Sequence, residues 1–367
     1  MNRVLKNKIV IAVIALVVLL GIFAVIALMG IKPKEAKTKI GFIMSGSADE
    51  AGWNGMHYAG VREACDKLGV ELLVKENVKE FTGACNEAIR ELVADGAGMI
   101  VLSSYNYSEE AIETVKQYPE IVFYGNSSEY HEENLTSYFV RMYQARYLSG
   151  IIAGMRTRTN AVGYVAAMPN NEVNRGINAF TLGVKRVNPD ATVTVAWTGS
   201  WDDEAAEKEA AQKLIEQGQA DVLTYHQNKT YVVEVAEKAG IDSIGYHEAP
   251  NEHSQHYLTA VVCDWTLAYE EVIRTFMRGK GNSVPNYWIG LEEGVVGLSA
   301  YSDEVSEEIS QEIEAAKSDI LSGDDVFSGI IYDNTGALRC AEKETISDEI
   351  LLERFDWYVE GVEFYEK

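Results

Sequence analysis

Proline and basic residues are both scarce in this chain of 367 residues. The chain has only 6 Pro, too few for a proline-rich stalk or linker. Its 32 Lys and Arg stand against 56 Asp and Glu, a net charge of −24. This balance argues against nucleic acid as a partner, because binding to phosphates requires a basic face. An apolar content of 47% with 20 Tyr and 6 Trp excludes a disordered chain, and the length favours two domains with substantial cores.

The cysteines form no metal-binding or redox motif. Cys65, Cys85, Cys263 and Cys340 are widely spaced, and none forms a C-x-x-C pair. Two fall on helical patterns and one ends an apolar strand, so we expect them to be buried as small hydrophobic residues. An oxidising compartment would allow a disulfide, but the sequence alone does not pair them.

One long apolar run stands near the N-terminus. Residues 9–31 carry no charge and, at ~1.5 Å rise per residue, would span the ~30 Å hydrocarbon core of a bilayer. Arg3, Lys6 and Lys8 precede the run, which predicts a cytoplasmic N-terminus and an extracytoplasmic body at a bacterial cell membrane. The run exceeds the ~7–15 apolar residues of a signal peptide, so we expect an uncleaved anchor over 1–31, with a cleaved signal as the alternative. Residues 32–38 would form a tether.

Beyond residue 38, apolar β-rich runs alternate with amphipathic helical stretches. Strands are predicted at 39–44, 70–74, 99–103, 121–124, 162–166, 192–197, 222–225, 243–246 and 257–262. Helices are predicted at 53–68, 80–94, 109–117, 141–155, 172–186, 204–217, 230–239 and 266–278. The acidic stretch 303–325 also has a helical period and should expose one face to solvent. Two consecutive sets of alternating elements predict an α/β fold of two Rossmann-like lobes with parallel sheets.

Ligands of open α/β sheets bind beyond the carboxyl ends of the strands. Most of the predicted strand ends carry an aromatic residue or Met beside a polar neighbour. The candidates are Trp53, Asn54, Tyr105, Asn106, Met168, Trp201, His226, Tyr246, His247 and Trp265. Aromatic faces would stack on a flat, uncharged ligand while amides and imidazoles bind its edges. For any single residue, the alternative is that it merely fills the end of a sheet.

Enzyme and metal motifs are absent from the sequence. No G-x-S-x-G, Walker P-loop or G-x-G-x-x-G at a strand–helix junction occurs. His247, His253 and His256 lie around Pro250, which indicates a hydrated loop at the cleft; a transition-metal site and direct ligand contact by His247 are the alternatives. We therefore predict no enzyme, no catalytic residue, no metal site and no cofactor.

Several sequence blocks also carry a family resemblance. They are 52–54 with His57 and Gly60, 143–147 with Gly150 and Gly154, 162–168, 172–180 with Gly183, 187–190, 225–226, 244–246, and 288–291 with Gly294. Over roughly residues 39–333 the chain resembles the basic membrane protein (BMP) family of ABC-transporter substrate-binding proteins. Within that family it is similar to members that bind adenine or purine nucleosides.

The resemblance implies a type I periplasmic-binding-protein fold with two lobes joined by a hinge. Lobe 1 would comprise 39–140 plus about 264–285, and lobe 2 would comprise 141–263 plus about 286–367. Trp53 would stack on the base, and the cleft would be lined by Tyr105, Gln144, Trp201, His226, Tyr246 and Trp265. Relatives often carry acidic residues at the positions of Gln144 and His247, where they would hold ribose hydroxyls. Their replacement here favours a free base, or a different small molecule, over a nucleoside.

The sequence thus predicts an extracytoplasmic solute-binding protein that delivers a neutral purine base or nucleoside to an ABC permease and its ATPase. A membrane-tethered sensor of the same fold is the alternative. A transcription regulator would need a basic DNA-binding head where the apolar run lies, and a purine nucleoside hydrolase would need a nucleophile or metal in the cleft. Nucleotides are not expected to bind, because no Arg–Lys cluster lies at the strand ends. Arg146 and Lys229 are interpreted as packing or surface residues.

Overall fold

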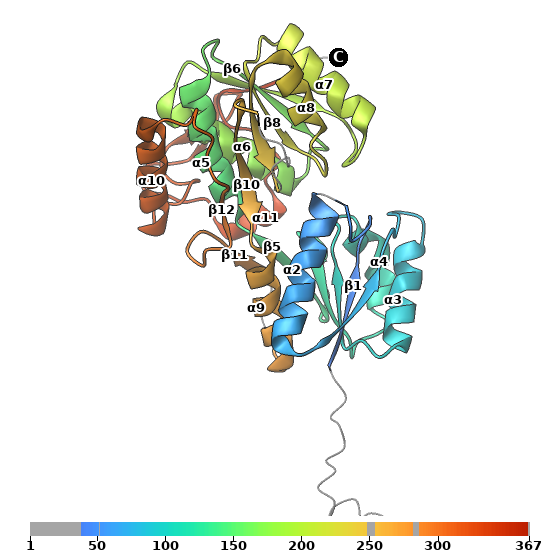
Figure 1. Cartoon of the computed structure of the whole chain (residues 1–367). Helices are drawn as coiled ribbons and strands as arrows, with labels where there is room; N and C mark the ends of the chain where they lie inside the picture. The colour runs from blue at the N-terminus through green and yellow to red at the C-terminus, as the bar shows by residue number, and fades with distance from the viewer. Residues whose placement is uncertain (1–37, 51, 248–253, 282–285, 366–367) are drawn as a thin grey trace, which may run out of the picture. The chain divides into compact units, whose positions relative to one another are not determined.

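The computed structural model describes residues 38–50, 52–247, 254–281 and 286–365 (Figure 1). Residues from Lys39 onward form one compact unit, separate from the preceding segment. The predicted membrane anchor lies outside the described residues. In the part of the chain that is described, no helix is long and apolar enough to cross a membrane.

The first lobe is built on a sheet of six parallel strands in the order β11-β5-β4-β3-β1-β2. These are β1 (Lys39–Ile43), β2 (Glu71–Lys75), β3 (Met99–Leu102), β4 (Val122–Asn126), β5 (Leu135–Val140) and β11 (Asn286–Ile289). Helices α2 (Trp53–Leu68) and α9 (Trp265–Met277) pack together on one face, and α3 (Ala84–Ala94) and α4 (Tyr107–Val115) on the other (Figure 1). Because helices cover both faces, β3 is a continuous apolar run.

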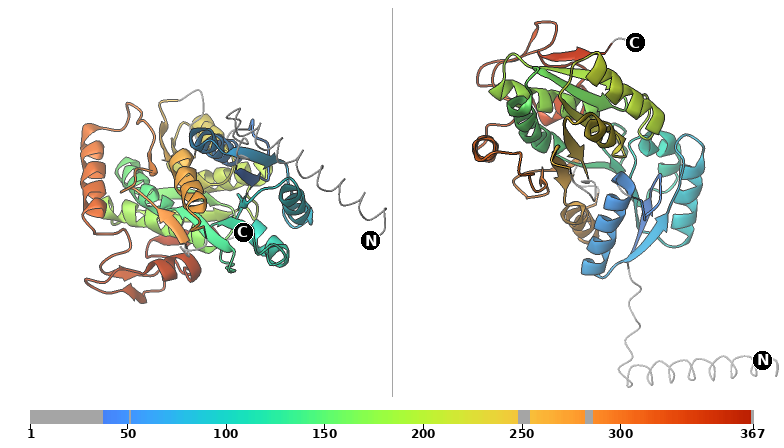
Figure 2. Two further views of the ribbon diagram at one scale, coloured as in Figure 1. Left: turned by 90° about the horizontal axis from the view of Figure 1, so that it is seen from below. Right: turned by 45° about the horizontal axis from the view of Figure 1, so that its top comes forward.

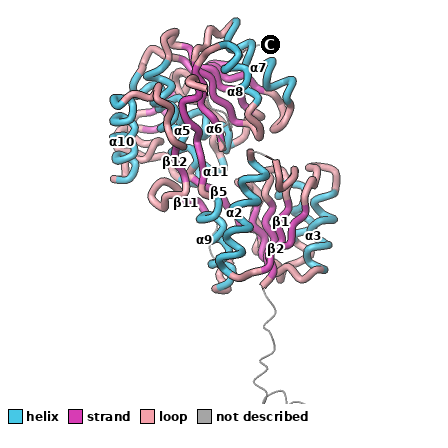
Figure 3. Tube along the Cα trace, in the orientation of Figure 1, coloured by secondary structure: helices cyan, strands magenta, loops and turns pink. Residues whose placement is uncertain are grey.

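The second lobe is built on a sheet of seven strands in the order β12-β10-β9-β8-β6-β7-β15, of which only the β10–β12 pair is antiparallel. The strands are β6 (Ala161–Ala166), β7 (Thr192–Trp197), β8 (Val222–His226), β9 (Asp242–Tyr246), β10 (Tyr257–Cys263), β12 (Val296–Leu298) and β15 (Val362–Phe364). Helices α5 (Met142–Arg156) and α6 (Asn171–Val187) pack together beside this sheet, as do α7 (Glu204–Glu216) and α8 (Tyr231–Ala239). Figure 3 shows both sheets between their helices.

The remaining elements pack around the second lobe. Helix α10 (Glu307–Leu321) lies against α5, as Figure 2 also shows, and α11 (Asp348–Glu353) contacts α6. Strands β13 (Ile331–Tyr332) and β14 (Leu338–Cys340) form a small antiparallel pair.

Helices α5 and α6 approach each other closely because glycines face the partner backbone. A Cβ on Gly150 would lie 2.0 Å from the Phe180 carbonyl oxygen, and one on Gly183 would lie 2.0 Å from the Tyr147 carbonyl oxygen. Since α5 follows the first sheet and α6 follows β6, this contact positions the start of α6 between the lobes.

The two-lobe α/β class with parallel sheets is confirmed. The acidic stretch forms α10, with Ile309, Ile313, Ala316 and Ile320 buried along one face. All four cysteines are free and buried. The sequence analysis assigns residues from about 286 onward to lobe 2, but β11 (286–289) pairs with β5 in the first sheet, and the chain returns to the second sheet only at β12.

Some elements differ from the sequence prediction. Helix α3 begins at Ala84 rather than at residue 80, because Phe81 (φ 55°) and Gly83 (φ 85°) adopt left-handed backbone conformations that interrupt a helix. Strand β5 and the short elements after α9, other than α10, were not predicted. The short strands among them have too few residues for a clear hydrophobic period.

Candidate functional site

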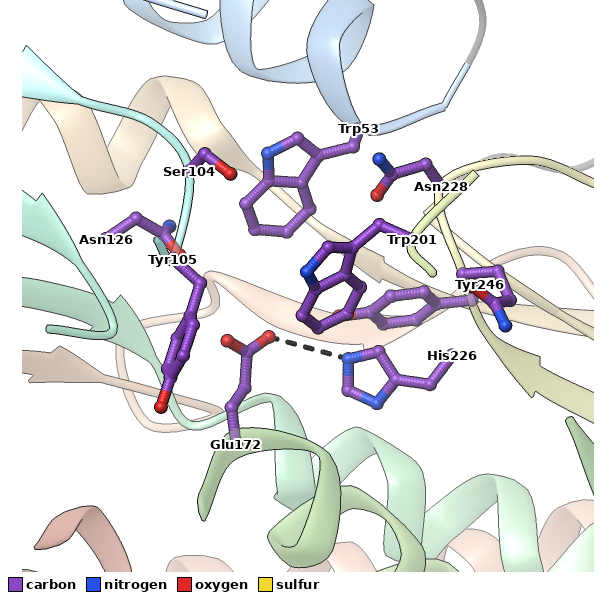
Figure 4. Close-up of a pocket in the computed structure, with 10 residues that line it drawn as sticks. Trp53, Ser104, Tyr105, Asn126, Glu172, Trp201, His226, Asn228 and Tyr246 are labelled. Atoms are coloured by element: carbon purple, nitrogen blue, oxygen red, sulfur yellow. Dashed lines mark ion pairs between the residues drawn. The ribbon is translucent and has the colours of Figure 1, made fainter. Parts of the chain in front are cut away.

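A cavity with about 360 Å³ of empty space lies between the lobes (Figure 4). The first lobe contributes Trp53, Ser104, Tyr105 and Asn126, and the second contributes Glu172, Trp201, His226, Gln227, Asn228 and Tyr246. All of them lie at or after the carboxyl end of a parallel strand, where open α/β sheets bind ligands.

A hydrogen bond and contacts with neighbouring rings fix the position of the Trp53 indole. Trp53 is the first residue of α2, and its indole Nε1 donates a hydrogen bond to the Ser103 carbonyl oxygen at 3.1 Å. The centroid of its ring lies 4.0 Å from that of His57 and 4.9 Å from that of His247. Its remaining surface lines the cavity (Figure 4). The indole therefore offers a pre-positioned aromatic surface to a ligand.

Tyr246 offers a second aromatic surface, from the end of β9. The Arg146 guanidinium stacks on its ring at 3.9 Å from the centroid and donates a hydrogen bond to the Tyr225 carbonyl oxygen at 2.9 Å. Burial raises the pKa of Tyr246 well above its usual value, so the phenol keeps its proton. Its hydroxyl has no hydrogen-bond partner among the described residues, as is also true of the Trp201 indole nitrogen. Both groups are available to a ligand.

Glu172 and His226 meet at the base of the cavity (Figure 4). His226 Nε2 lies 3.4 Å from Glu172 Oε1, and both side chains are buried. Burial raises the pKa of Glu172 to about 7, although Arg175, a hydrogen bond with Ser127, and Arg146 oppose this shift. Burial also lowers the pKa of His226 well below its usual value, so this imidazole is neutral at neutral pH.

Several contacts join the lobes around the cavity. A Cβ on Gly52 would lie 2.1 Å from the Asn228 carbonyl oxygen, and Lys229 Nζ lies 2.8 Å from Glu50 Oε2. Glu129 Oε1 accepts hydrogen bonds from the Tyr105 hydroxyl at 2.7 Å and from Asn171 Nδ2 at 2.6 Å. The two lobes are therefore closed around the cavity in this structure.

The structure brings part of the predicted site together. Five predicted residues line the cavity: Trp53, Tyr105, Trp201, His226 and Tyr246. His247 and Trp265 lie behind Trp53, with ring centroids 4.9 Å and 5.7 Å from it.

Four predicted residues do not line the cavity. The Asn54 amide donates to Glu50 Oε1 at 2.6 Å, and the Asn106 amide donates to Glu80 Oε2 at 2.9 Å. Gln144 Oε1 accepts a hydrogen bond from the Leu291 backbone N–H at 2.9 Å. Met168 is half-buried in the loop after β6.

The sequence analysis did not select five of the lining residues. These are Ser104, Asn126, Glu172, Gln227 and Asn228. The expectation that ligands bind at the carboxyl ends of strands applies to these residues too, since Asn126 ends β4 and Gln227 and Asn228 come directly after His226. Glu172 supplies a carboxyl group to the cavity, although the positions of Gln144 and His247 carry none.

The histidine loop does not form a described metal site. Among the residues that the structure describes, no group of three or more His, Cys, Asp or Glu could hold a metal ion. His253 lies outside them, and the His256 imidazole contacts Asp242 at 3.2 Å, away from the residues that line the cavity.

Comparison with known proteins identifies relatives of this chain. Residues 37–326 match the Bmp family, described as ABC transporter substrate-binding protein PnrA-like. A purine-binding protein of Brucella abortus is 32% identical over 90% of this chain and 94% of its own length. A Haloferax volcanii protein, named as an ABC transporter glucose-binding protein, is 31% identical over 90% of this chain and 82% of its own.

Solved structures share the fold. A transcriptional activator of the comK gene from Bacillus halodurans superposes with a TM-score of 0.67 at 24% identity, covering 78% of this chain and 99% of its own. An ABC transporter solute-binding protein from Aeropyrum pernix superposes with a TM-score of 0.65 at 20% identity, covering 81% and 93%. Members of the matching family are extracytoplasmic, bind small-molecule solutes for a permease and are not enzymes. The chain therefore belongs to the Bmp family of PnrA-like ABC transporter substrate-binding proteins, with their two-lobed periplasmic-binding-protein-like fold.

Proposed function

We propose that this protein captures a neutral purine base, and a nucleoside equally well or less well, between two lobes that close on it. The observation that carries the proposal is the cavity itself. It brings the aromatic rings of Trp53, Trp201 and Tyr246 together with polar groups that have no hydrogen-bond partner among the described residues. Aromatic side chains stack on flat bases, and polar groups at the edge of the cavity would bind the edge of the base.

The charges around the cavity argue against a phosphate. The nearby arginines are already engaged with protein oxygen atoms, Arg146 with Tyr225 and Arg175 with Leu351. Lys229 is paired with Glu50 across the lobes. A nucleotide would need free charge-assisted donors, and among the described lining residues neither Lys nor Arg occurs.

Two relatives of this chain are named for different ligands, a purine and glucose. We favour the purine because the aromatic rings and largely neutral polar groups of the cavity suit a flat base. The test is calorimetry on the full chain with adenine, guanine, hypoxanthine, adenosine, AMP and glucose. We expect the bases to bind best and AMP and glucose not at all. Bound ligand should also stabilise the fold, by about 2.7 kcal/mol at a hundredfold excess over Kd. Tight binding of AMP, or of glucose without any purine, would contradict the proposal.

We further propose that residues 9–31 stay attached as the membrane anchor. The observation behind it is the long apolar run after Arg3, Lys6 and Lys8. Peptide mapping of protein from the membrane fraction should recover the peptide that contains Arg3. A mature N-terminus between residues 32 and 38 would show instead that the run is a cleaved signal.

A further inference from the structure

We infer that Glu172 determines which purines the site accepts. As a carboxylic acid, its side chain pairs with an edge of the base that has an acceptor beside a donor. As a carboxylate, it pairs with an edge of the base that has two donors. The inference rests on the proposed purine function and adds to it the choice between bases. It assigns adenine and hypoxanthine to the protonated site, and guanine to both the protonated and the ionised site.

Glu172 is placed to contact a bound base. Of the described residues that line the cavity, it alone carries a carboxyl group. It lies in the first turn of α6, which begins with the Asn170 side chain accepting from the Val173 backbone N–H at 2.9 Å. The close contact of α5 with α6 fixes this helix, and Gly176 allows α6 to approach His226, since a Cβ there would lie 3.2 Å from His226 Nδ1.

The contact with His226 leaves the Glu172 carboxyl group able to bind a ligand. The two groups are 3.4 Å apart, and neither nitrogen of His226 makes a hydrogen bond of acceptable geometry among the described residues. Because the pKa of His226 lies well below its usual value, the imidazole stays neutral as the pH changes around 7. It therefore carries no charge that would favour the ionised form of Glu172. A base that enters the cavity can therefore replace this contact.

Charged and titratable groups reach Glu172 from several elements. Arg175 lies on its own helix, Arg146 on α5 and His226 on β8. Four tyrosines, all with raised pKa values, also face it: Tyr105, Tyr138, Tyr164 and Tyr246. The arginines favour the carboxylate and burial favours the acid, which together bring the pKa of Glu172 to about 7. Both forms are therefore populated near neutral pH.

The two forms present different hydrogen-bonding patterns. A carboxylic acid has one donor beside one acceptor, whereas a carboxylate has acceptors only. Adenine presents a ring nitrogen acceptor beside its amino group, and hypoxanthine presents a carbonyl oxygen beside its ring N–H, so each matches the acid. Guanine has the same carbonyl oxygen beside its ring N–H and so also matches the acid, but its ring N–H also lies beside its amino group, and these two donors match the carboxylate. Of the three bases, only guanine therefore matches both forms. A mismatched edge would leave a buried polar group unpaired, which is costly.

The first test measures adenine and guanine affinities of the full chain at pH 6 and pH 8, by quenching of tryptophan fluorescence, since Trp53 and Trp201 line the cavity. With a pKa of about 7, the protonated fraction falls about tenfold from pH 6 to pH 8, and apparent affinity scales with the competent fraction. Adenine should bind about tenfold more weakly at pH 8, whereas guanine, which can pair with both forms, should not weaken. An unchanged ratio of the two affinities would overturn the inference.

The second test is Glu172→Gln, because an amide donates and accepts like the acid but cannot ionise. This variant should keep adenine binding at both pH values and lose the pH dependence. Glu207→Gln is the matched control: Glu207 is also a buried carboxyl group of the second lobe, with its pKa raised to about 8 by burial, but it does not line the cavity. This control should behave as wild type.

The outcomes separate the inference from the proposed function. Purine binding whose selectivity ignores pH, or persists unchanged in Glu172→Gln, leaves the proposed function standing and overturns the inference. A pH dependence that disappears in Glu207→Gln overturns it as well, because the titrating group would then lie elsewhere. Failure of every purine to bind overturns both. Should Glu172→Gln fail to fold, the wild-type pH series together with the Glu207→Gln control decides the matter.

Discussion

Replacing Trp53 with Ala is expected to weaken purine binding by about ten- to hundredfold, since stacking of a base on an aromatic side chain contributes roughly 1–3 kcal/mol. The effect should be large because His57, His247 and the hydrogen bond to Ser103 hold the indole in position before a ligand arrives. Binding to a pre-positioned ring requires little further ordering. Calorimetry of the full-length variant with adenine measures the change.

Trp197→Ala provides the matched control for Trp53→Ala. Trp197 is also a half-buried tryptophan at the end of a strand, but it stacks on Phe364 at 6.3 Å and does not line the cavity. Its loss should lower stability without changing affinity, and Trp53→Phe should recover part of the binding. Unchanged affinity in Trp53→Ala would mean that the ligand binds elsewhere.

Replacing Gly52 with Ala should also weaken binding by about ten- to hundredfold, by hindering closure of the lobes. The added Cβ would lie 2.1 Å from the Asn228 carbonyl oxygen, a clash that exists only while the lobes are in contact. Overpacking of this kind costs typically 1–3 kcal/mol, and a less stable closed state lowers the apparent affinity in proportion. Small-angle scattering should show compaction of the wild type on adding adenine, and less compaction of the variant.

Gly83→Ala separates the clash from backbone strain. Gly52 (φ 86°, ψ −145°) and Gly83 (φ 85°, ψ −8°) each precede the first residue of a helix in the first lobe, and both positive φ angles disfavour Ala, more strongly at Gly52, whose backbone region is essentially restricted to glycine. A Cβ on Gly83, however, would meet no atom within 4 Å. Gly83→Ala should therefore lose stability but keep wild-type affinity and compaction. Equal loss of affinity in the two variants would contradict the role assigned to the contact between the lobes.

Much of the architecture is local in origin and could be predicted. Alternation of apolar runs with amphipathic stretches identified most strands and helices of both lobes, since hydrophobic periodicity reflects which faces a segment buries. Parallel strands place their carboxyl ends at one edge. For that reason Trp53, Tyr105, Trp201, His226 and Tyr246 could be grouped from sequence before the structure placed them around one cavity.

The direction of each loop side chain was not predictable in the same way. Asn54 and Asn106 sit beside residues that line the cavity, yet they bind the carboxylates of Glu50 and Glu80. A short polar side chain takes the nearest partner that its backbone conformation allows, and that partner comes from elsewhere in the fold. Such competition leaves no periodic signal in the sequence.

Composition and local patterns suffice to predict the two-lobe α/β class, the acidic surface and the family. The position of Glu172 in the lining of the cavity, and the burial that raises its pKa to about 7, follow instead from tertiary contacts. Both depend on the approach of α6 to α5 and on the meeting of the lobes over the carboxyl group. Burial and the charges of Arg146 and Arg175 act through space, so residues distant in the chain set the chemistry of this one side chain.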